Sequence, residues 1–460
     1  MRSRLRRESF AEKCYRYRGV ILVVCVPLAL ISVVLVLMPR SIGTNSLVGY
    51  DAFNLPSKDI KIPGKKKRYA VVFDAGSSGS RVHVFCFDSK TQLVKVGDEL
   101  ELFKQKKPGL SNYASDPKAG AESLQSLLDE ALGVVPPDQQ STTPVRLGAT
   151  AGLRLLPGDQ SKELLQEVDR LLEQSPFKFE SEWVNIIDGT QEGSYQWVTV
   201  NYLLGNLGKS FDHTVGIVDL GGGSVQMAYA LSEEDAGKAP AGDKNEESYV
   251  QKIKLLGVTY NLYVHSYLNY GLYAARAEVL KLVEDGSSCP CLPKGFQGPY
   301  KYGDNTYTTL ASDEGGDYDK CKSLVVKALN TDRACTHMKC TFGGIWSGGG
   351  GDGFKKLFVA SFFFDRAVDA GIIKDESALT AKVKPLDFEE AARKFCAIDL
   401  GEEQKFLCLD LVYQYSLLVT GFQLDSEQEL TLVKKVEYKG SAVEAAWPLG
   451  SAIELLSGHQ

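Results

Sequence analysis

The residues best suited to chemistry lie in two segments that share one plan. In each segment an apolar run ends in an aspartate, a turn of small residues follows, and a second apolar run returns. The first segment is Ala70-Val-Val-Phe-Asp-Ala-Gly-Ser-Ser-Gly-Ser-Arg-Val-His-Val-Phe85. The second is Val215-Gly-Ile-Val-Asp-Leu-Gly-Gly-Gly-Ser-Val-Gln-Met-Ala-Tyr229. Both patterns predict a β-hairpin with a Gly/Ser turn.

The two turns have the composition of a phosphate site. Glycine lets backbone N–H groups approach a ligand closely, and serine adds a hydroxyl donor. A concave array of such donors binds phosphate, and Asp74 and Asp219 at the strand ends can each hold a cation or a water. Because the plan occurs twice, we predict two similar lobes that face each other across a cleft. Two ordinary tight hairpins are the alternative at this point.

Two further polar groups lie between the hairpins. A short strand at 145–149 runs into a small-residue turn, where Thr150 supplies a hydroxyl group. A strand at 183–187 is followed by Asp-Gly-Thr-Gln-Glu192, the expected start of a helix. A carboxylate near a helix N-terminus is favoured by the helix dipole. Helix capping and general-base catalysis therefore both stay open for Glu192.

Length and composition indicate a globular protein of two or three domains. The chain has 460 residues, of which 44% are hydrophobic and 24% charged, values that are ordinary for a folded protein. The formal net charge of -6 argues against a general nucleic-acid surface.

The N-terminus combines positive charge with a long apolar run. Residues 20–38 carry no charged side chain, and arginine and lysine outnumber glutamate before them. We therefore expect a cytosolic basic tail at 1–19, a transmembrane signal anchor at 20–38 and a stalk at 39–67. A cleaved signal peptide is the alternative, but its apolar core would be only about 7–15 residues long. We expect a single-pass type II protein whose catalytic part is lumenal or extracellular, in the Golgi or at the plasma membrane.

The cysteines fit such a compartment. Of the 10 cysteines, most lie between positions 289 and 408, and an oxidising compartment permits disulfides. The short loops Cys335–Cys340 and Cys396–Cys408 are the expected disulfides, and Cys321 can pair with Cys289 or Cys291. A zinc site is disfavoured because paired CxxC motifs and nearby histidines are missing.

Periodicity assigns most of the remaining segments. Early in the chain we expect a strand at 93–103 and helices at 120–132 and 161–173. Later we expect a surface loop or lid at 232–247, a strand at 249–258 and helices at 260–282, 357–367, 388–396 and 402–418.

Several aromatic residues and one cysteine have two interpretations. The tyrosine stripe within the expected helix at 260–282 is better explained by core packing than by base binding. Trp346, inside a glycine run, either covers a nucleobase or caps a loop. Cys86, in the first hairpin, is expected to be a buried free thiol.

Five motifs in fixed order resemble the apyrase-conserved regions of the nucleoside triphosphate diphosphohydrolases, the apyrase family. The basic N-terminus and single anchor look most like plant membrane apyrases, since two-anchor members carry a C-terminal span that is not seen here. The motifs are Asp74–Arg81, Ala149–Arg154, Gly189–Asn201, Val218–Gln226 and Trp447–Gly450.

The resemblance implies an α/β fold with two actin-like (RNase H-like) lobes around a nucleotide cleft. The first lobe would comprise 68–210 with 440–460, and the second lobe 211–439. Substrates would be nucleoside tri- and diphosphates, cleaved at the terminal phosphate by metal-dependent attack of water, so that ATP and ADP yield AMP and phosphate. The sequence leaves the oligomeric state open.

The resemblance also implies roles for the motif residues. Glu192 would be the general base, and Ser78, Ser224 and Gln226 would position water and phosphate. Ca²⁺ or Mg²⁺ would be held by Asp74 and Asp219, largely through its waters, and Thr150 and Glu192 would also belong to the metal site. Phosphate and nucleotide contacts would come from the motif residues Asp74, Gly76, Ser77, Ser78, Gly79, Ser80, Arg81, Thr150, Gly221, Gly222, Gly223, Ser224, Gln226 and Trp447.

Two positions depart from the family pattern. Gln196 stands where a small or apolar residue is usual, and the fourth motif has Gly-Gly-Gly-Ser where many members have Gly-Gly-Ala-Ser. We expect Gln196 to lie inside its helix without touching the chemistry.

Three other functions are compatible with parts of this pattern. A Golgi nucleoside diphosphatase that prefers GDP and UDP is the nearest alternative. A nucleotide sensor without turnover would not need the intact Glu192. A kinase of the same fold would need an acceptor pocket and usually a catalytic aspartate.

Overall fold

The computed structural model describes residues 67–240, 248–283, 287–303, 305–335, 339–350 and 352–457. The expected basic tail, anchor and nearly all of the stalk lie outside these residues, as does 241–247 of the expected lid. Within the described ranges, no helix has both the length and the apolar character needed to cross a membrane.

The first hairpin belongs to a six-stranded sheet with the order β3-β2-β1-β5-β6, in which β4 also pairs with β2. Strand β1 pairs antiparallel with β2 and parallel with β5, and β5 pairs parallel with β6. The expected strand at 93–103 is two short strands, β3 and β4. The strands are β1 (Arg68–Ala75), β2 (Ser80–Phe87), β3 (Leu93–Val94), β4 (Glu101–Lys106), β5 (Val145–Ala149) and β6 (Val184–Ile186).

The second hairpin belongs to a seven-stranded sheet with the order β14-β15-β13-β7-β8-β10-β9. Strand β7 pairs antiparallel with β8 and parallel with β13, and β13 pairs parallel with β15. The strands are β7 (Gly216–Leu220), β8 (Ser224–Leu231), β9 (Val250–Leu255), β10 (Val258–Leu268), β13 (Leu357–Ser361), β14 (Thr380–Val383) and β15 (Leu430–Val433).

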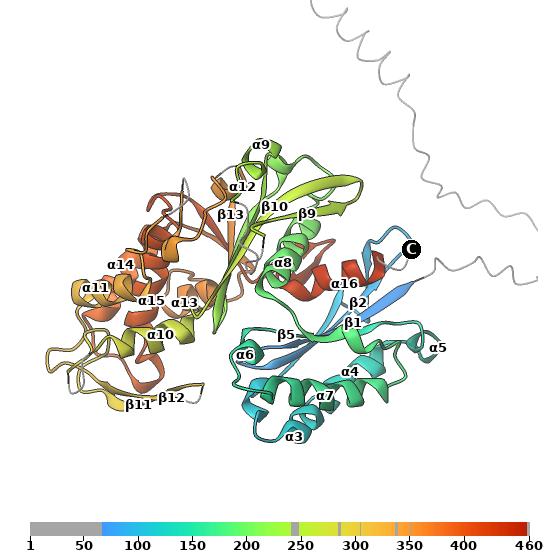
Figure 1. Ribbon diagram of the computed structural model, residues 1–460, viewed down its shortest axis with the longest axis horizontal. Helices are drawn as coiled ribbons and strands as arrows, with labels where there is room; N and C mark the ends of the chain where they lie inside the picture. The colour runs from blue at the N-terminus through green and yellow to red at the C-terminus, as the bar shows by residue number, and fades with distance from the viewer. Residues whose placement is uncertain are drawn as a thin grey trace, which may run out of the picture. The chain divides into compact units, whose positions relative to one another are not determined.

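The two sheets repeat one topology. The run β2-β1-β5-β6 in the first sheet matches β8-β7-β13-β15 in the second, because each is an antiparallel hairpin followed by two parallel strands. The duplicated hairpin plan of the sequence thus corresponds to an α/β fold with two sheet-rich lobes (Figure 1). The lobe boundaries given above stay a prediction.

Helices surround both sheets. Helix α7 shows why: Leu164, Val168 and Leu172, spaced four residues apart, form its buried stripe. In the first part of the chain the helices are α3 (Pro117–Ser123), α4 (Gln125–Val134), α5 (Pro137–Gln140), α6 (Ala151–Arg154), α7 (Gln160–Glu173) and α8 (Gly189–Leu203). In the second part they are α9 (Glu233–Ala236), α10 (Leu272–Lys281), α11 (Tyr318–Ala328), α12 (Asp352–Lys355), α13 (Phe362–Asp369), α14 (Pro385–Cys396), α15 (Leu407–Ser416) and α16 (Trp447–Ser457).

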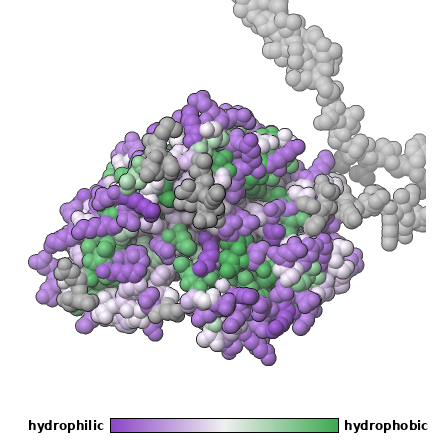
Figure 2. All heavy atoms as spheres, in the orientation of Figure 1, coloured by the Kyte–Doolittle hydropathy of each residue, from purple (hydrophilic) through white to green (hydrophobic). Residues whose placement is uncertain are grey.

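Two small hairpins complete the strands, β11 (Gln297–Tyr302) with β12 (Asn305–Leu310) and β16 (Lys435–Tyr438) with β17 (Ser441–Glu444). On the face seen in Figure 2, hydrophilic residues cover most of the periphery and hydrophobic residues gather towards the middle.

Helices α8 and α16 cross between the two sheets (Figure 1). Helix α8 follows strand β6 of the first sheet but packs on β8 and β10 of the second, whereas α16 packs on β1. The helices approach closely because position 450 is glycine: a Cβ atom at Gly450 would lie 2.1 Å from the Tyr195 carbonyl oxygen. These two helices join the lobes.

Two expected helices are wrong in part. The segment from Val258 to Leu268 is strand β10, and the helix begins only at Leu272. Along β10, Tyr260, Leu262 and Val264 contribute to one hydrophobic core and Tyr263 to another, which is the two-residue alternation of a strand buried on both faces. The expected helix at 357–367 likewise begins with strand β13, and α13 follows.

The cysteine pairings are settled for the described residues. Disulfides join Cys335 to Cys340 and Cys396 to Cys408, as expected, and Cys321 pairs with Cys291. Cys86 and Cys289 are buried free thiols.

Trp346 packs in the core of the second lobe. Its side chain is only 1% exposed, and its ring makes edge contacts with Tyr249 and Tyr263. A nucleobase could not stack on it, so the structural interpretation of Trp346 replaces the base-binding one.

Candidate active site

The first turn is closed by its own backbone and by an ion pair. The Gly76 amide donates to the Gly79 carbonyl at 3.1 Å. Asp74, the last polar residue of β1, faces Arg81 across the hairpin, and the Arg81 Nη1 atom lies 2.9 Å from the Asp74 carboxylate. Arg81 also donates to the Ser78 hydroxyl at 3.4 Å. The turn therefore presents a fixed guanidinium group beside its backbone amides.

Three small-residue turns meet at this point. A Cβ atom at Gly222 would lie 3.0 Å from the Ser77 Oγ atom, and one at Gly152 would lie 2.9 Å from the Ser77 Cα atom. One at Gly223 would lie 3.1 Å from the Ala151 Cβ atom. The structure thus brings both hairpin turns and the turn after β5 together, which is why all three consist of small residues.

Thr150 lies at the join between β5 and α6. It is the N-cap residue of α6, but its hydroxyl makes no capping hydrogen bond. Its amide donates to the Ala75 carbonyl at 3.2 Å, which ties it to the end of β1. Its side chain is therefore available to a ligand next to the first turn.

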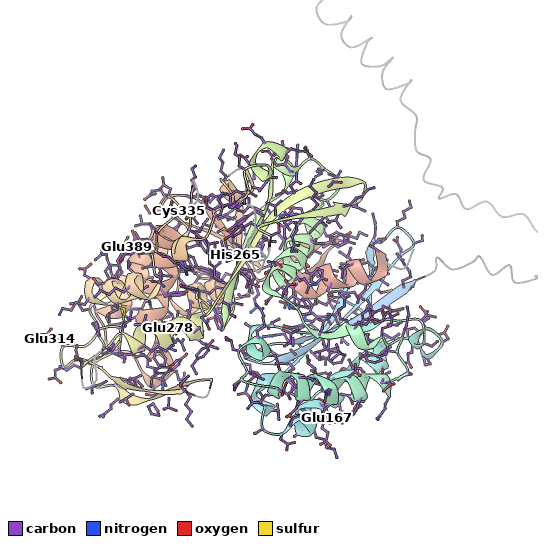
Figure 3. The ribbon with its side chains drawn as sticks, in the orientation of Figure 1. Glu167, His265, Glu278, Glu314, Cys335 and Glu389 are labelled. Atoms are coloured by element: carbon purple, nitrogen blue, oxygen red, sulfur yellow. A yellow bond between two sulfur atoms is a disulfide. The ribbon has the colours of Figure 1, made fainter. Side chains whose placement is uncertain are left out.

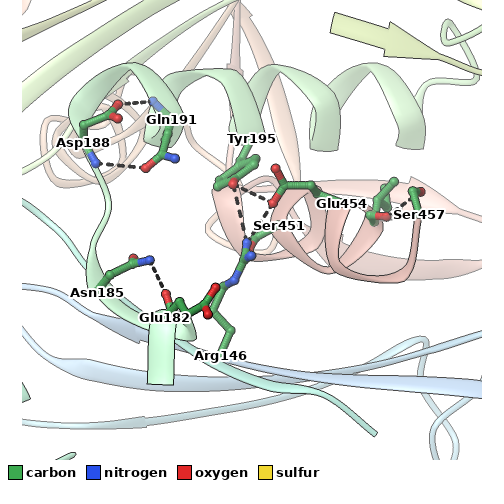
Figure 4. A network of polar contacts seen from close by, with 10 residues as sticks. Arg146, Glu182, Asn185, Asp188, Gln191, Tyr195, Ser451, Glu454 and Ser457 are labelled. Carbon is green, nitrogen blue, oxygen red and sulfur yellow. Dashed lines mark hydrogen bonds and ion pairs between the residues drawn. The ribbon is translucent and has the colours of Figure 1, made fainter. Parts of the chain in front are cut away.

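The start of α8 is capped by a residue other than Glu192. Asp188 and Gln191 form a reciprocal capping box: the Gln191 amide donates to Asp188 Oδ1 at 2.6 Å, and the Asp188 amide donates to Gln191 Oε1 at 3.3 Å (Figure 4). Helix capping thus falls to Asp188. Glu192 does not cap the helix, and its carboxylate contacts Gln226 on strand β8 of the second sheet.

Polar side chains from two elements, α6 and β8, contact the Glu192 carboxylate. Arg154, at the end of α6, forms an ion pair with Glu192 Oε2. Gln226 on β8 donates to the same oxygen at 3.4 Å and to the Ser224 hydroxyl at 2.7 Å. Gln226 also donates to the Ser266 hydroxyl on β10 at 3.0 Å.

The charges of Asp74 and Asp219 act on the Glu192 carboxyl, as its shifted pKa indicates. Burial raises the pKa of Glu192 to about 8; Arg154 opposes this shift, and the charges of Asp219 and Asp74 add to it. Burial also raises the pKa of Asp219, Asp74 adds to this, and hydrogen bonds from Ser361 and Gln196 oppose it. A site of this kind favours a group that brings positive charge.

The donor set fits a hard divalent cation. Asp74 is paired with Arg81 and Glu192 with Arg154, but Asp219 makes no ion pair within the described ranges. The Asp219 Oδ1 atom is buried and receives no hydrogen bond. Carboxylate oxygens are the ligands that Ca²⁺ and Mg²⁺ prefer. The described residues contain no group of three or more His, Cys, Asp or Glu side chains arranged as a direct metal cage.

The structure gives contacts for three residues that the sequence could not supply: Trp447, Gln196 and Arg154. Trp447 is 4% exposed and packs against Gly148, where a Cβ would lie 2.5 Å from its ring, so its observed role is packing. Gln196 lies buried inside α8, as expected, and a hydrogen bond from it opposes the rise in the pKa of Asp219. Arg154 was part of a motif but had no assigned role; only its contact with Glu192 gives it one.

The surroundings of two serines, Ser80 and Ser266, could also be seen only in the structure. Ser80 is buried and its hydroxyl has no hydrogen-bond partner, whereas the Ser78 hydroxyl accepts a hydrogen bond from Arg81. Ser266 lies in the segment expected to be helical, and only its position on β10 places it beside Gln226.

Comparisons with known proteins agree with this geometry. The chain is 55% identical to a rice (Oryza sativa subsp. japonica) protein named Probable apyrase 1, with 98% of this chain and 96% of that protein covered. It is 54% identical to Apyrase 1 of Arabidopsis thaliana, with 98% of each covered. The crystal structure of nucleoside triphosphate hydrolases from Neospora caninum matches 85% of this chain and 93% of that one, with a TM-score of 0.59 and 14% identity.

The fold and the converging turns thus define a two-lobed α/β phosphohydrolase. A family model for the GDA1/CD39 (nucleoside phosphatase) family matches residues 61–460. The chain belongs to this family, and it is an enzyme of the apyrase class that hydrolyses nucleotide phosphates.

Proposed function

We propose that this enzyme hydrolyses the terminal phosphate of both nucleoside tri- and diphosphates, taking ATP and ADP to AMP, by direct attack of water. The observation that carries the proposal is the position of Glu192: a buried carboxylate, freed from capping and held by Arg154 and Gln226, beside two glycine-rich turns. A carboxylate with a raised pKa next to a phosphate cradle is suited to accept the proton of water.

The chain's own residues supply the positioning. The backbone amides of 76–81 and 221–224 bind the phosphate oxygens, and Arg81 adds charge to the first turn. Ser78, Ser224 and Gln226 orient the phosphate and the attacking water, and Glu192 accepts the proton. Because the transition state of phosphoryl transfer is loose, positioning and electrostatics account for most of the catalysis.

We further propose a divalent cation, Ca²⁺ or Mg²⁺, next to Asp74 and Asp219, with Thr150 at its edge. Support comes from the unpaired Asp219 carboxylate and its buried, unbonded Oδ1 atom. The cation would neutralise charge on the phosphate oxygens. We expect phosphate release by the full-length protein to stop when EDTA removes divalent cations and to return with Mg²⁺ or Ca²⁺; activity that persists in EDTA would contradict this.

The test of the base is Glu192→Gln. We expect turnover of ATP to fall by about 10²- to 10⁴-fold, the usual range for losing a general base, while nucleotide binding is kept. The matched control is Glu454→Gln, which removes a carboxylate from the α16 ion pair with Arg146 (2.9 Å) and should leave turnover unchanged. Wild-type turnover by Glu192→Gln would remove Glu192 as the base.

The substrate range needs rates for ATP, ADP, GDP and UDP under one set of conditions. We expect comparable hydrolysis of ATP and ADP. Strong preference for GDP and UDP, with little ATP hydrolysis, would instead indicate a nucleoside diphosphatase of the Golgi type.

We also propose that the protein is anchored as a single-pass type II membrane protein with its catalytic part lumenal or extracellular. The three disulfides among the described residues support an oxidising compartment. Alkaline carbonate extraction and protease protection of membranes that carry the full-length protein test the anchor and its orientation.

A further inference from the structure

The two donors that hold Glu192 converge on one of its oxygens. Arg154 Nη2 and Gln226 Nε2 both donate to Oε2, and no hydrogen bond from the described residues reaches Oε1. A carboxylate held in this way has one oxygen fixed as an acceptor for the protein and one oxygen left for a ligand.

The donors are themselves fixed. Gln226 is fixed by the hydroxyls of Ser224 and Ser266, at 2.7 and 3.0 Å from its Nε2 atom. Because Nε2 has only two N–H hydrogens, its 3.4 Å contact with Glu192 Oε2 is a shared hydrogen bond that supplements the Arg154 ion pair. Gly189, the first residue of α8, makes room for this arrangement, because a Cβ there would lie 2.1 Å from Ser266 Oγ and 2.9 Å from Arg154 Nη1. The start of α8 can therefore approach Arg154 and Ser266 only because residue 189 has no side chain.

Among the described residues, Arg154 forms an ion pair with Glu192 alone. Its side chain is 14% exposed, and its Nε atom is buried without a hydrogen-bond acceptor. A buried guanidinium group needs a paired anion, and Glu192 is the anion that the structure provides. The pair also joins α6 to α8.

We propose that Arg154 is a positioning residue: it fixes Oε2 of Glu192 together with Gln226, so that Oε1 is the oxygen that takes the proton of the attacking water. The inference rests on the proposed function, since it assigns the acting atom of the proposed base. Arg154 then acts through Glu192 and does not bind the phosphate, which falls to Arg81 and the two turns.

Steady-state kinetics of Arg154→Ala test this, with ATP as substrate and divalent cation at a saturating concentration. A displaced base slows the chemical step without changing phosphate contacts, and a misplacement of about 1 Å can cost about 10²-fold. We expect kcat to fall about 10²-fold and KM to stay within about threefold of wild type. Arg154→Lys, which keeps the charge, should recover at least about a tenth of the wild-type kcat.

Arg146→Ala is the matched control. Arg146 is 13% exposed, against 14% for Arg154, and is likewise ion-paired to a glutamate, Glu454. It lies in the α16 network, where Tyr195 also donates to Glu454 at 2.7 Å (Figure 4). Removing it should lower thermal stability without lowering kcat, which separates loss of a buried arginine from loss of base positioning.

A double variant decides between the two ways in which Arg154 could act. If Arg154 acts through Glu192, adding Arg154→Ala to Glu192→Gln should reduce kcat no further. A rise in KM of more than about tenfold for Arg154→Ala, or an additional loss in the double variant, would overturn the proposal in favour of a direct phosphate contact.

The remaining outcomes are also decisive. If Arg154→Ala does not fold, Arg154→Lys replaces it: reduced kcat at unchanged KM supports positioning, and a changed KM opposes it. If Glu192→Gln keeps wild-type turnover, the proposed function fails at its base. If Glu192→Gln is inactive but Arg154→Ala keeps its kcat, only the positioning proposal fails.

Discussion

At the scale of single residues, the site sets three carboxylates against two arginines. Arg81 pairs with Asp74 and Arg154 with Glu192, which leaves the charge of Asp219 to be balanced by something else. Burial raises the pKa of Asp219, and the charge of Asp74 adds to this rise. The Asp219 Oδ1 atom also receives no hydrogen bond. Substrate phosphate adds still more negative charge, so a cation beside Asp219 is the simplest way to balance the site.

Gln196→Leu tests how far Asp219 depends on its neighbours. Gln196 donates to the Ala445 carbonyl at 3.0 Å and hydrogen-bonds to Asp219. Leucine removes both, so we expect a loss of about 1–3 kcal/mol in unfolding free energy from the buried groups left without partners. With the donor gone, the pKa of Asp219 rises further, and a cation must displace a more tightly bound proton. The cation concentration for half-maximal activity should therefore rise several-fold.

Gln414→Leu is the control for that experiment. Gln414 is also buried, and it donates to the Phe362 carbonyl at 2.7 Å without contacting the site carboxylates. Gln414→Leu should lower the unfolding free energy measured in urea by a similar amount but leave the cation titration unchanged. An unchanged cation midpoint in Gln196→Leu would show that Asp219 does not depend on this hydrogen bond.

The sequence could identify some of these residues but not others. The turns and Glu192 follow from local patterns, because glycine, serine and a carboxylate at a helix start have local reasons to be there. Arg154 and Ser266 could not be assigned, since their roles come from contacts made by segments far apart in the chain. The helical position of Gln196 could be predicted, but its neighbour Asp219 could not, because a helix position alone does not show which strand it faces.

At the scale of elements, the close crossing of α8 and α16 limits which side chains fit between the two helices. Gly450→Ala tests it: the new methyl group would lie 2.1 Å from the Tyr195 carbonyl oxygen, and the helices would have to separate. We expect a loss of about 1–3 kcal/mol, the usual effect of overpacking, measured by urea unfolding.

Gly133→Ala is the opposite case within a helix. A Cβ at Gly133 of α4 would have no atom within 4 Å. Replacing this glycine should therefore stabilise the protein by about 0.5–1 kcal/mol through helix propensity. If both variants changed stability by the same amount and sign, close packing would not be what requires glycine at 450.

The elements that sequence patterns misassigned share a physical property. Strands β10 and β13 are buried on both faces, so they lack the polar alternation that marks a half-buried strand. Tyr260, Tyr263 and Tyr267 also happen to be spaced as on a helix face. By contrast, α7 was predicted nearly to its bounds, because its apolar stripe faces one sheet and its other side faces water.

At the scale of the whole described unit, the lobes share a hydrophobic core. One cluster of buried residues contains Ala70 and Val72 of β1, Ile217 of β7 and Ala228 of β8, together with Trp197 of α8 and Ala452 of α16. The two helices therefore form a packed layer between the sheets. Any change in the angle between the lobes must be taken up by this layer, which also carries Glu192.

His265 packs against the core of the second lobe and makes global stability depend on pH. It lies on β10 within the second lobe (Figure 3), and its ring centroid is 4.6 Å from that of Tyr267 and 5.7 Å from that of Tyr249. Burial lowers the pKa of His265 from 6.5 to about 4. The unfolded chain thus binds a proton between pH 6.5 and 4 that the folded protein does not, so stability falls as the pH is lowered through this range.

His265→Phe isolates that contribution because it keeps an aromatic ring and removes the proton site. From the two pKa values, His265 should cost the wild type about 2 kcal/mol of unfolding free energy between pH 7.5 and pH 5. Urea unfolding of both proteins at pH 7.5 and pH 5 gives the change in unfolding free energy for each. The buried carboxylates titrate in both proteins, so their contribution drops out when the two changes are compared. We expect the variant to gain about 2 kcal/mol on the wild type at the lower pH, and a gap independent of pH would mean that His265 is protonated as readily in the folded protein as in the unfolded chain.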